Sequence, residues 1–412
     1  MRSLASNSLI LSASNVLSAV LGFSLSLIIG RGVGAAGFGV WTFCMAWAAL
    51  LTMICEFGLN SLLIREAVRM PESSNRLLAV SLALKLIFVT ILGSCVWLLA
   101  PVLSLDLKSS AALSVSLLIA VVGIVFGSFT ALFKASGWMS PILWLNGLGG
   151  IFQVGWSLWI IRSGSGILSL IWAAVAIDLS QLVAAILLWW HRIRPQGGRL
   201  DISSIDALQM LKDSMPFAIS AFLGALESRS SVLLLGYLSG ETEVGRFGMA
   251  SRFFEASRLL PNGIYDSAFP ALAAARRSTA RADRKMMQRL GQLILIYTVG
   301  VVMILILFSH QIIHLTYGEG FISAAPTLTL LGVALLPTLH NALTEVYLFA
   351  TGDEKYATRL GSFGLMVQIL ASIPLMTLYG APGAAVGILC GELVIWLPLQ
   401  WRLKRLTLSV DE

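Results

Sequence analysis

Charged residues are scarce in this sequence. Only 12% of its 412 residues are Asp, Glu, Lys or Arg, whereas soluble domains contain roughly 25%. Hydrophobic residues make up 57% of the chain, and the mean hydropathy is +0.85. A water-soluble core cannot bury so much apolar surface, and the long unbroken apolar runs exclude a β-barrel. Since helices of about 20 apolar residues satisfy their own backbone groups in lipid, we predict an all-α integral membrane protein.

Cysteines are few, and motifs for metals or nucleotides are missing. The four cysteines, Cys44, Cys55, Cys95 and Cys390, lie inside apolar runs and form no CxxC pair. Neither a disulfide framework nor a zinc site is therefore indicated. The sequence also has no P-loop motif for nucleotide phosphates, which argues against ATP hydrolysis by this chain. We expect no cofactor and no metal site.

Apolar runs separated by charged, Gly and Pro clusters predict about twelve transmembrane helices. The first run is long, contains Ser and Asn and is followed by further spans, so we interpret it as a permanent helix and not as a cleaved signal. The twelve spans are expected near residues 7–30, 38–62, 77–100, 110–133, 141–161, 167–190, 214–238, 244–272, 290–313, 323–350, 357–379 and 383–401.

Lys and Arg residues fall mainly in alternate connections between these spans, including the basic segment 276–289. Cytoplasmic loops carry the excess of Lys and Arg in membrane proteins, so both termini are predicted to face the cytoplasm. The net charge of +7 then reflects topology and an attraction to anionic membrane lipids. It gives no reason to expect a nucleic-acid partner.

A weak internal repeat divides the chain into two halves. Two glycines four residues apart are followed by a Phe-Gly pair, at Gly30, Gly34 and Phe38-Gly39 and again at Gly236, Gly240 and Phe247-Gly248. We predict an N-terminal six-helix lobe over 1–191, a cytoplasmic linker over 192–212 and a C-terminal six-helix lobe over 213–412. With an even number of spans per half, the lobes would be related by an axis along the membrane normal and would enclose a central cavity.

Short motifs in both halves resemble one family of transporters. They are Gly30-Arg31-Gly32-Val33-Gly34, Gly37-Phe38-Gly39-Val40-Trp41, Glu56-Phe57-Gly58-Leu59, Ser214-Met215-Pro216, Leu235-Gly236, Val244-Gly245-Arg246-Phe247-Gly248, Pro261, Phe269-Pro270, Ala350-Thr351-Gly352 with Lys355, and Tyr379-Gly380-Ala381-Pro382-Gly383-Ala384-Ala385. In this order and spacing they resemble the Wzx-type O-antigen and polysaccharide flippases, the polysaccharide biosynthesis family of the multidrug/oligosaccharidyl-lipid/polysaccharide (MOP) superfamily. The family usually has Asp where this chain has Glu56.

The resemblance implies a MOP/MATE-like fold and a transporter that is not an enzyme. It implies that the chain moves a polyprenyl-diphosphate-linked oligosaccharide, such as an O-antigen, capsule or exopolysaccharide repeat unit, across the bacterial inner membrane by alternating access. A polysaccharide polymerase and a chain-length regulator are the partners that this role suggests. Two other transporters, which differ in the substrate they move, are alternatives to this function. They are a multidrug or organic-cation exporter of the same superfamily and a lipid II flippase.

An enzyme of another class, an integral-membrane glycan polymerase or ligase, would have a similar number of helices. Such an enzyme needs a sizeable outer loop for catalysis. The longest outer connections expected here, near 101–109 and 313–322, are about ten residues long, which is too short for a separate folded unit.

Four cations fall inside the expected spans, namely Lys85, Arg229, Arg252 and Arg258. A charge at mid-membrane costs about 2.5–3.5 kcal/mol even on the lenient insertion scale, so each needs a partner or a wet cavity. Arg pairs bidentately with phosphate oxygens, and these cations are therefore candidates for binding a lipid diphosphate. A local alternative is open for two of them, because Glu255 lies three residues from both Arg252 and Arg258 and can pair with them along one helix.

Carboxylates inside the expected spans are candidates for coupling transport to protons or sodium, because intramembrane carboxylates can be protonated or can bind cations. The residues predicted for this role are Glu56, Asp178, Glu227 and Glu255.

Overall fold

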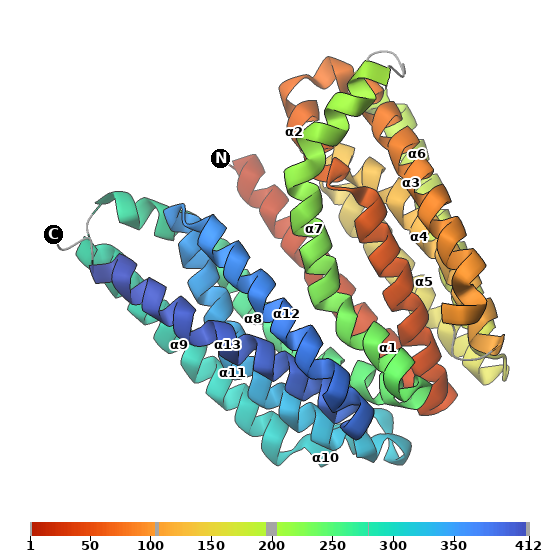
Figure 1. Ribbon diagram of the computed structural model, residues 1–412. Coiled ribbons are helices and arrows are strands. Elements are labelled where there is room, and N and C mark those ends of the chain that lie inside the picture. Colours follow the sequence, from red (N-terminus) through yellow and green to blue (C-terminus); the bar gives the residue numbers. More distant parts are fainter. Residues whose placement is uncertain (1, 104–106, 195–203, 279, 409–412) are drawn as a thin grey trace. The chain divides into compact units, whose positions relative to one another are not determined.

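The computed structural model describes residues 2–103, 107–194, 204–278 and 280–408, and in these ranges the chain forms helices and no β-strand (Figure 1). The all-helical fold that the apolar runs predict is thus confirmed. The elements are α1 (Arg2–Glu56), α2 (Leu59–Arg69), η1 (Pro71–Ser73), α3 (Ser74–Leu103), α4 (Leu107–Ala135), α5 (Ser140–Arg162), α6 (Ile167–Arg192), α7 (Ser204–Ser239), α8 (Glu241–Ser278), α9 (Ala280–Leu307), α10 (Ser309–Tyr317), η3 (Glu319–Ala324), α11 (Ala325–Thr351), α12 (Glu354–Tyr379) and α13 (Ala381–Leu408).

Nine of the helices in the described part of the chain are long and apolar enough to cross a membrane. The first of these, Ile10–Glu56, covers most of the first two expected spans in one helix with a kink. Helices α5 and α8 are not among the nine. Their sequences explain this, because α5 is rich in Gly and contains Asn and Gln, and α8 carries charged residues along its length. The number of twelve spans stays a prediction.

The kink in α1 lies at Gly34, where φ is 72° and ψ is −177°. Its counterpart in the internal repeat, Gly240, lies between α7 and α8 and has a φ of 86°. Side chains with a Cβ rarely adopt positive φ, so glycine is favoured at both turns. The two glycines thus share a positive φ, and the repeat stays a prediction.

Three expected boundaries differ from the structure. The second span was expected to reach residue 62, but α1 ends at Glu56 because Phe57 and Gly58 have positive φ values of 48° and 68°, and α2 then continues the chain. The ninth span, expected over 290–313, is interrupted at Phe308 between α9 and α10. The expected linker 192–212 is shorter, since α7 begins at Ser204, and its residues 195–203 lie outside the described ones.

The chain divides into two compact units. Unit 1 comprises residues 1–33 and 40–233, and unit 2 comprises 34–39 and 234–412. This boundary lies inside α7, beyond the expected linker, because the first part of α7 packs on unit 1. Met210, for example, lies in a buried cluster with Leu62 of α2 and Leu84 of α3. The assignment of two six-helix transport lobes stays a prediction.

Each unit has its own core. In unit 1, α4 packs against α6, α3 and α2, and the rings of Phe129 and Trp189 meet edge to face with their centroids 5.5 Å apart. In unit 2, α11 lies among α8, α9, α12 and α13. There the hydroxyl of Tyr265 on α8 donates to the carbonyl oxygen of Leu339 on α11 at 2.6 Å, which satisfies a buried polar group.

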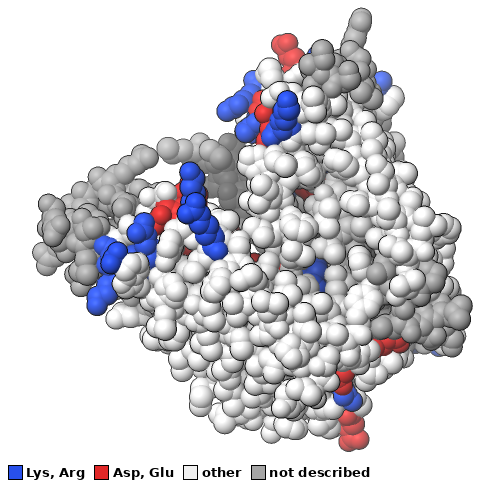
Figure 2. Space-filling model, in the orientation of Figure 1, with Lys and Arg blue, Asp and Glu red and all other residues white. Residues whose placement is uncertain are grey.

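The surface of the described residues fits a membrane. On the visible face, the flanks of the helices are almost free of charge, and the side chains of Lys, Arg, Asp and Glu gather near helix ends (Figure 2). Large apolar side chains such as Trp159, Leu370 and Leu397 are more than half exposed. Exposed apolar side chains of this size are favourable in lipid and unfavourable in water.

Candidate functional site

Lys85 on α3 is completely buried inside unit 1. Its ammonium Nζ donates hydrogen bonds to Asn60 Oδ1 at 2.5 Å and to Ser128 Oγ at 2.8 Å. These partners come from α2 and α4, so a single cation joins three helices. The carboxylate of Glu56 attracts the same ammonium electrostatically. The expected wet cavity around Lys85 is thus replaced, in this structure, by a packed and hydrogen-bonded site.

The other three cations lie on α7 and α8. Arg229 is half-buried in unit 1, whereas Arg252 and Arg258 belong to unit 2. Arg252 Nη1 lies 3.1 Å from Glu255 Oε2, so the local ion pair that their spacing allows is present. The guanidinium of Arg258 lies over the ring of Phe254, 5.6 Å from its centroid. Glu227 is exposed on α7.

The fourth predicted carboxylate, Asp178, lines a cavity of about 290 Å³ inside unit 1. The cavity lies among α1, α5 and α6, and its size is close to the lower end of typical small-molecule sites. Its walls are formed by Ser18, Leu21, Gly22, Leu25, Trp41, Asn146, Gly149, Gly150, Gln153, Ala174, Ile177, Asp178 and Gln181. We call it the polar cavity.

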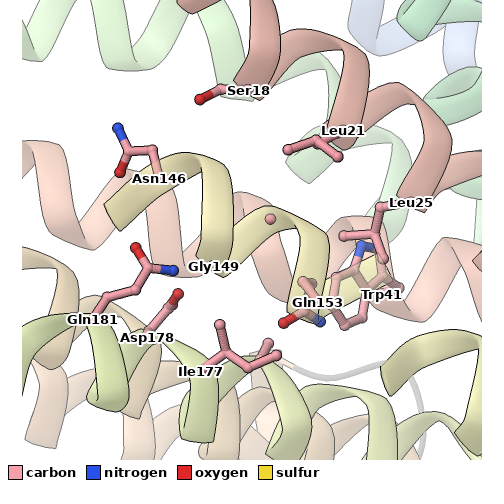
Figure 3. A pocket seen from close by; sticks show the side chains of 13 residues that line it. Ser18, Leu21, Leu25, Trp41, Asn146, Gly149, Gln153, Ile177, Asp178 and Gln181 are labelled. Carbon is pink, nitrogen blue, oxygen red and sulfur yellow. The ribbon is translucent and has the colours of Figure 1, made fainter. Parts of the chain in front are cut away.

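Amide and carboxylate groups converge in the polar cavity. Figure 3 shows Asp178 and Gln181 next to each other on α6, with Asn146 and Gly149 of α5 opposite them and Gln153 beside Trp41. The side-chain nitrogen Nε2 of Gln153 is buried and has no hydrogen-bond partner among the described residues. A buried donor without a partner costs about 1–3 kcal/mol, so a hydrogen bond to a ligand oxygen would relieve this cost. Among the described residues, no Lys or Arg lines the cavity.

Sequence reasoning found Asp178 but missed its polar neighbours. Asn146 and Gln153 are seven residues apart with Gly149 and Gly150 between them, so they share one face of α5. Asp178 and Gln181 are three apart and share a face of α6. Polar residues at helical spacing on two otherwise apolar helices are the signal that could have located the cavity, although one sequence does not reveal that the two faces meet.

A family model and two curated proteins, all concerned with polysaccharides, match this sequence. A family model described as polysaccharide biosynthesis protein matches residues 4–276. A candidate O-antigen transporter of Escherichia coli (strain K12) is 22% identical over 375 residues, which cover 89% of this chain and 88% of that protein. A candidate O-antigen transporter of Shigella dysenteriae is 24% identical over 204 residues, covering 45% of this chain and 47% of that protein.

Solved structures share the fold. The inward-facing conformation of a multidrug resistance MATE family transporter of the MOP superfamily has a TM-score of 0.76 and 17% identity, covering 96% of this chain and 95% of that one. The lipid II flippase MurJ in an inward closed conformation has a TM-score of 0.79 and 13% identity, covering 95% of this chain and 86% of that one. The predicted MOP/MATE-like fold is therefore confirmed.

Proposed function

Because the chain belongs to the polysaccharide biosynthesis protein family, we propose that it is a flippase for a polyprenyl-diphosphate-linked oligosaccharide. It carries an O-antigen, capsule or exopolysaccharide repeat unit from the cytoplasmic to the outer leaflet of the bacterial inner membrane by alternating access, with both termini in the cytoplasm. The chain is a multi-pass membrane transporter of polysaccharide type in the MOP superfamily, and it is not a polymerase or ligase.

The observation that supports the substrate is the polar cavity. A glycan presents many hydroxyl groups. Amides both donate to hydroxyls and accept from them, and an ionised carboxylate accepts from them. Asn146, Gln153, Asp178 and Gln181 supply such groups within one cavity, and Trp41 supplies an apolar ring beside them. The cavity takes part of the glycan while the lipid chain stays in the membrane. The unpaired Nε2 of Gln153 donates to a sugar oxygen in this arrangement.

One observation favours a second function, the export of an organic cation. Asp178 is the charged residue among those that line the polar cavity, and a carboxylate away from water attracts a cation strongly. The same carboxylate is the best placed of Glu56, Asp178, Glu227 and Glu255 for coupling to a proton or sodium ion, because Glu227 and Glu255 are exposed and Glu56 lies beside Lys85.

The diphosphate needs cations, and the lining of the polar cavity, as far as the structure describes it, contains none. Lys85, Arg229, Arg252 and Arg258 remain the predicted phosphate-binding residues. For Lys85, contact with phosphate requires α2, α3 and α4 to separate, since its ammonium is enclosed by Asn60 and Ser128. A polysaccharide polymerase and a chain-length regulator remain predicted partners.

The first experiment uses a strain that lacks this gene. Lipid-linked intermediates are extracted, and oxidation of the glycan by membrane-impermeant periodate in spheroplasts reports the leaflet. Accumulation of a polyprenyl-diphosphate oligosaccharide protected on the cytoplasmic side, reversed by the gene, supports the proposal. Normal translocation with increased sensitivity to cationic drugs instead supports the exporter.

The variant Gln153→Met tests the polar cavity. It removes a buried donor that has no partner and keeps the side chain's length, so the free energy of unfolding should stay the same or rise. Transport should nevertheless fall at least tenfold, because the sugar loses a hydrogen bond in the cavity. Gln311→Met, which changes an exposed residue of α10 in the same way, is the matched control and should keep full transport. Full transport by Gln153→Met would remove the cavity from the substrate path.

A further inference from the structure

A second, apolar groove runs along the outside of the α5 and α6 pair. It has a volume of about 370 Å³. Its walls are formed by Trp138, Ser140, Pro141, Trp144, Leu145, Leu148, Gly149, Phe152, Ser180, Gln181, Ala184 and Leu188. Trp144 and Phe152 are 63% and 65% exposed. We call it the chain groove. Along α5, from Ser140 to Phe152, it follows 12 residues, or about 18 Å of helix at 1.5 Å per residue.

Two residues, Gly149 and Gln181, line both the chain groove and the polar cavity. A Cβ atom at Gly149 would run into the side-chain amide of Gln181, so the Gln181 side chain lies directly against the bare backbone of α5. One glycine and one flexible amide therefore separate an apolar groove on the outside of the unit from a polar cavity inside it. This combination suits an amphiphile with a polar head and an apolar chain.

Cations mark one end of the chain groove. The guanidinium of Arg192 lies 4.3 Å from the ring centroid of Trp138, at the start of the groove. Arg192 and Lys134 are exposed, so their charges are accessible to a ligand. Arginine binds phosphate oxygens bidentately, and a lipid phosphate at this end would place its chain along the groove.

We propose that the chain groove binds the isoprenoid chain of the lipid carrier, with the carrier's phosphate at Arg192 and with Gln181 as the gate to the polar cavity. This assignment rests on the proposed function. A carrier of a bulky glycan needs a polar space beside its chain, and the polar cavity on the other side of Gly149 and Gln181 supplies one. An ordinary phospholipid needs no such space.

The test uses purified full-length protein in nanodiscs of phosphatidylethanolamine and phosphatidylglycerol. The probe is a polyprenyl monophosphate with a benzophenone on its isoprenoid chain, and labelled peptides are mapped by mass spectrometry. We expect labels on the α5 and α6 segments that line the groove. Ala184→Trp fills the groove and should lower labelling there at least fivefold. Arg192→Gln should weaken probe binding about tenfold.

The matched control is Ala176→Trp, which adds the same ring to an exposed alanine of α6 that does not line the groove. Its labelling should stay within twofold of the unmodified protein. If Ala184→Trp is not obtained as folded protein, Leu188→Trp occupies the same groove. Labels outside α5 and α6, or labelling of the groove that an excess of unlabelled polyprenyl monophosphate does not reduce, would overturn the proposal.

The gene-deletion strain separates this inference from the proposed function. If the unmodified gene does not restore glycan translocation, the proposed function fails. If it does restore translocation, and Ala184→Trp restores it equally well while the probe labels other helices, only the chain groove is wrong. Loss of translocation in Ala184→Trp together with loss of labelling supports both.

Discussion

The buried cation Lys85 gives the sharpest test of how unit 1 is held together. Its partners Asn60 and Ser128 accept hydrogen bonds from an ammonium with no access to water. Ser128→Ala removes one acceptor and should lower the free energy of unfolding by about 1–3 kcal/mol. Asn60→Leu removes the closer acceptor, and its cost should reach about 3–5 kcal/mol, as for other buried charges that lose a partner.

Replacing Lys85 itself should lower the free energy of unfolding much less than Asn60→Leu does. Lys85→Met fills the same space with an apolar chain and removes the cost of keeping an ammonium away from water, which offsets the hydrogen bonds that are lost. Ser128 Oγ still donates to the carbonyl oxygen of Ile124 at 3.2 Å. We therefore expect a loss below about 1 kcal/mol. The double variant of Lys85→Met with Asn60→Leu should recover most of the stability that Asn60→Leu loses alone.

Thermal unfolding of the purified variants in detergent measures these differences. The reasoning is refuted if Asn60→Leu is as stable as the unmodified protein, or if Lys85→Met is as damaging as Asn60→Leu. Glycan translocation is measured on the same variants. A stable Lys85→Met protein that no longer translocates assigns the charge to transport, whereas unchanged translocation leaves it a purely structural residue.

Two further predictions concern unit 2. A Cβ at Gly245 would overlap the carbonyl oxygen of Ala35, so Gly245→Ala should reduce the yield of monodisperse protein in size-exclusion chromatography, whereas Gly224→Ala, which has open space around it, should not. Arg402 and Asp353 form an ion pair whose side chains are 32% and 22% exposed; because solvent screens such pairs, Arg402→Gln should lower stability in thermal unfolding by no more than about 1 kcal/mol.

Much of the fold follows from the sequence because apolar helices in lipid satisfy their own backbone groups. Each expected span falls on a helix of the structure, apart from the interruptions at Phe57-Gly58 and Phe308. Those interruptions depend on tertiary packing. A Cβ at Gly58, for instance, would meet Phe217 of α7, a neighbour 159 positions away in the sequence.

The candidate site was predictable only in part. The chemical type of Lys85 and Asp178 marks them in the sequence, but their surroundings depend on contacts between helices. Asn60 is 25 residues from Lys85, and Gln181 lies against Gly149 of a different helix. The ion pair of Arg252 with Glu255 is local, so its spacing alone predicts it.

The six residues 34–39 of the first half complete unit 2. Phe38 is fully buried there, with its ring centroid 6.3 Å from that of Tyr317. A ribosome adding roughly 5–20 residues per second needs on the order of 15–60 s to pass from one residue to the other. During that time the segments near Phe38 can fold, but Phe38 cannot yet pack against Tyr317. Unit 2 therefore finishes folding only after most of the protein has been made, and a fragment that starts at residue 234 lacks part of its own interior.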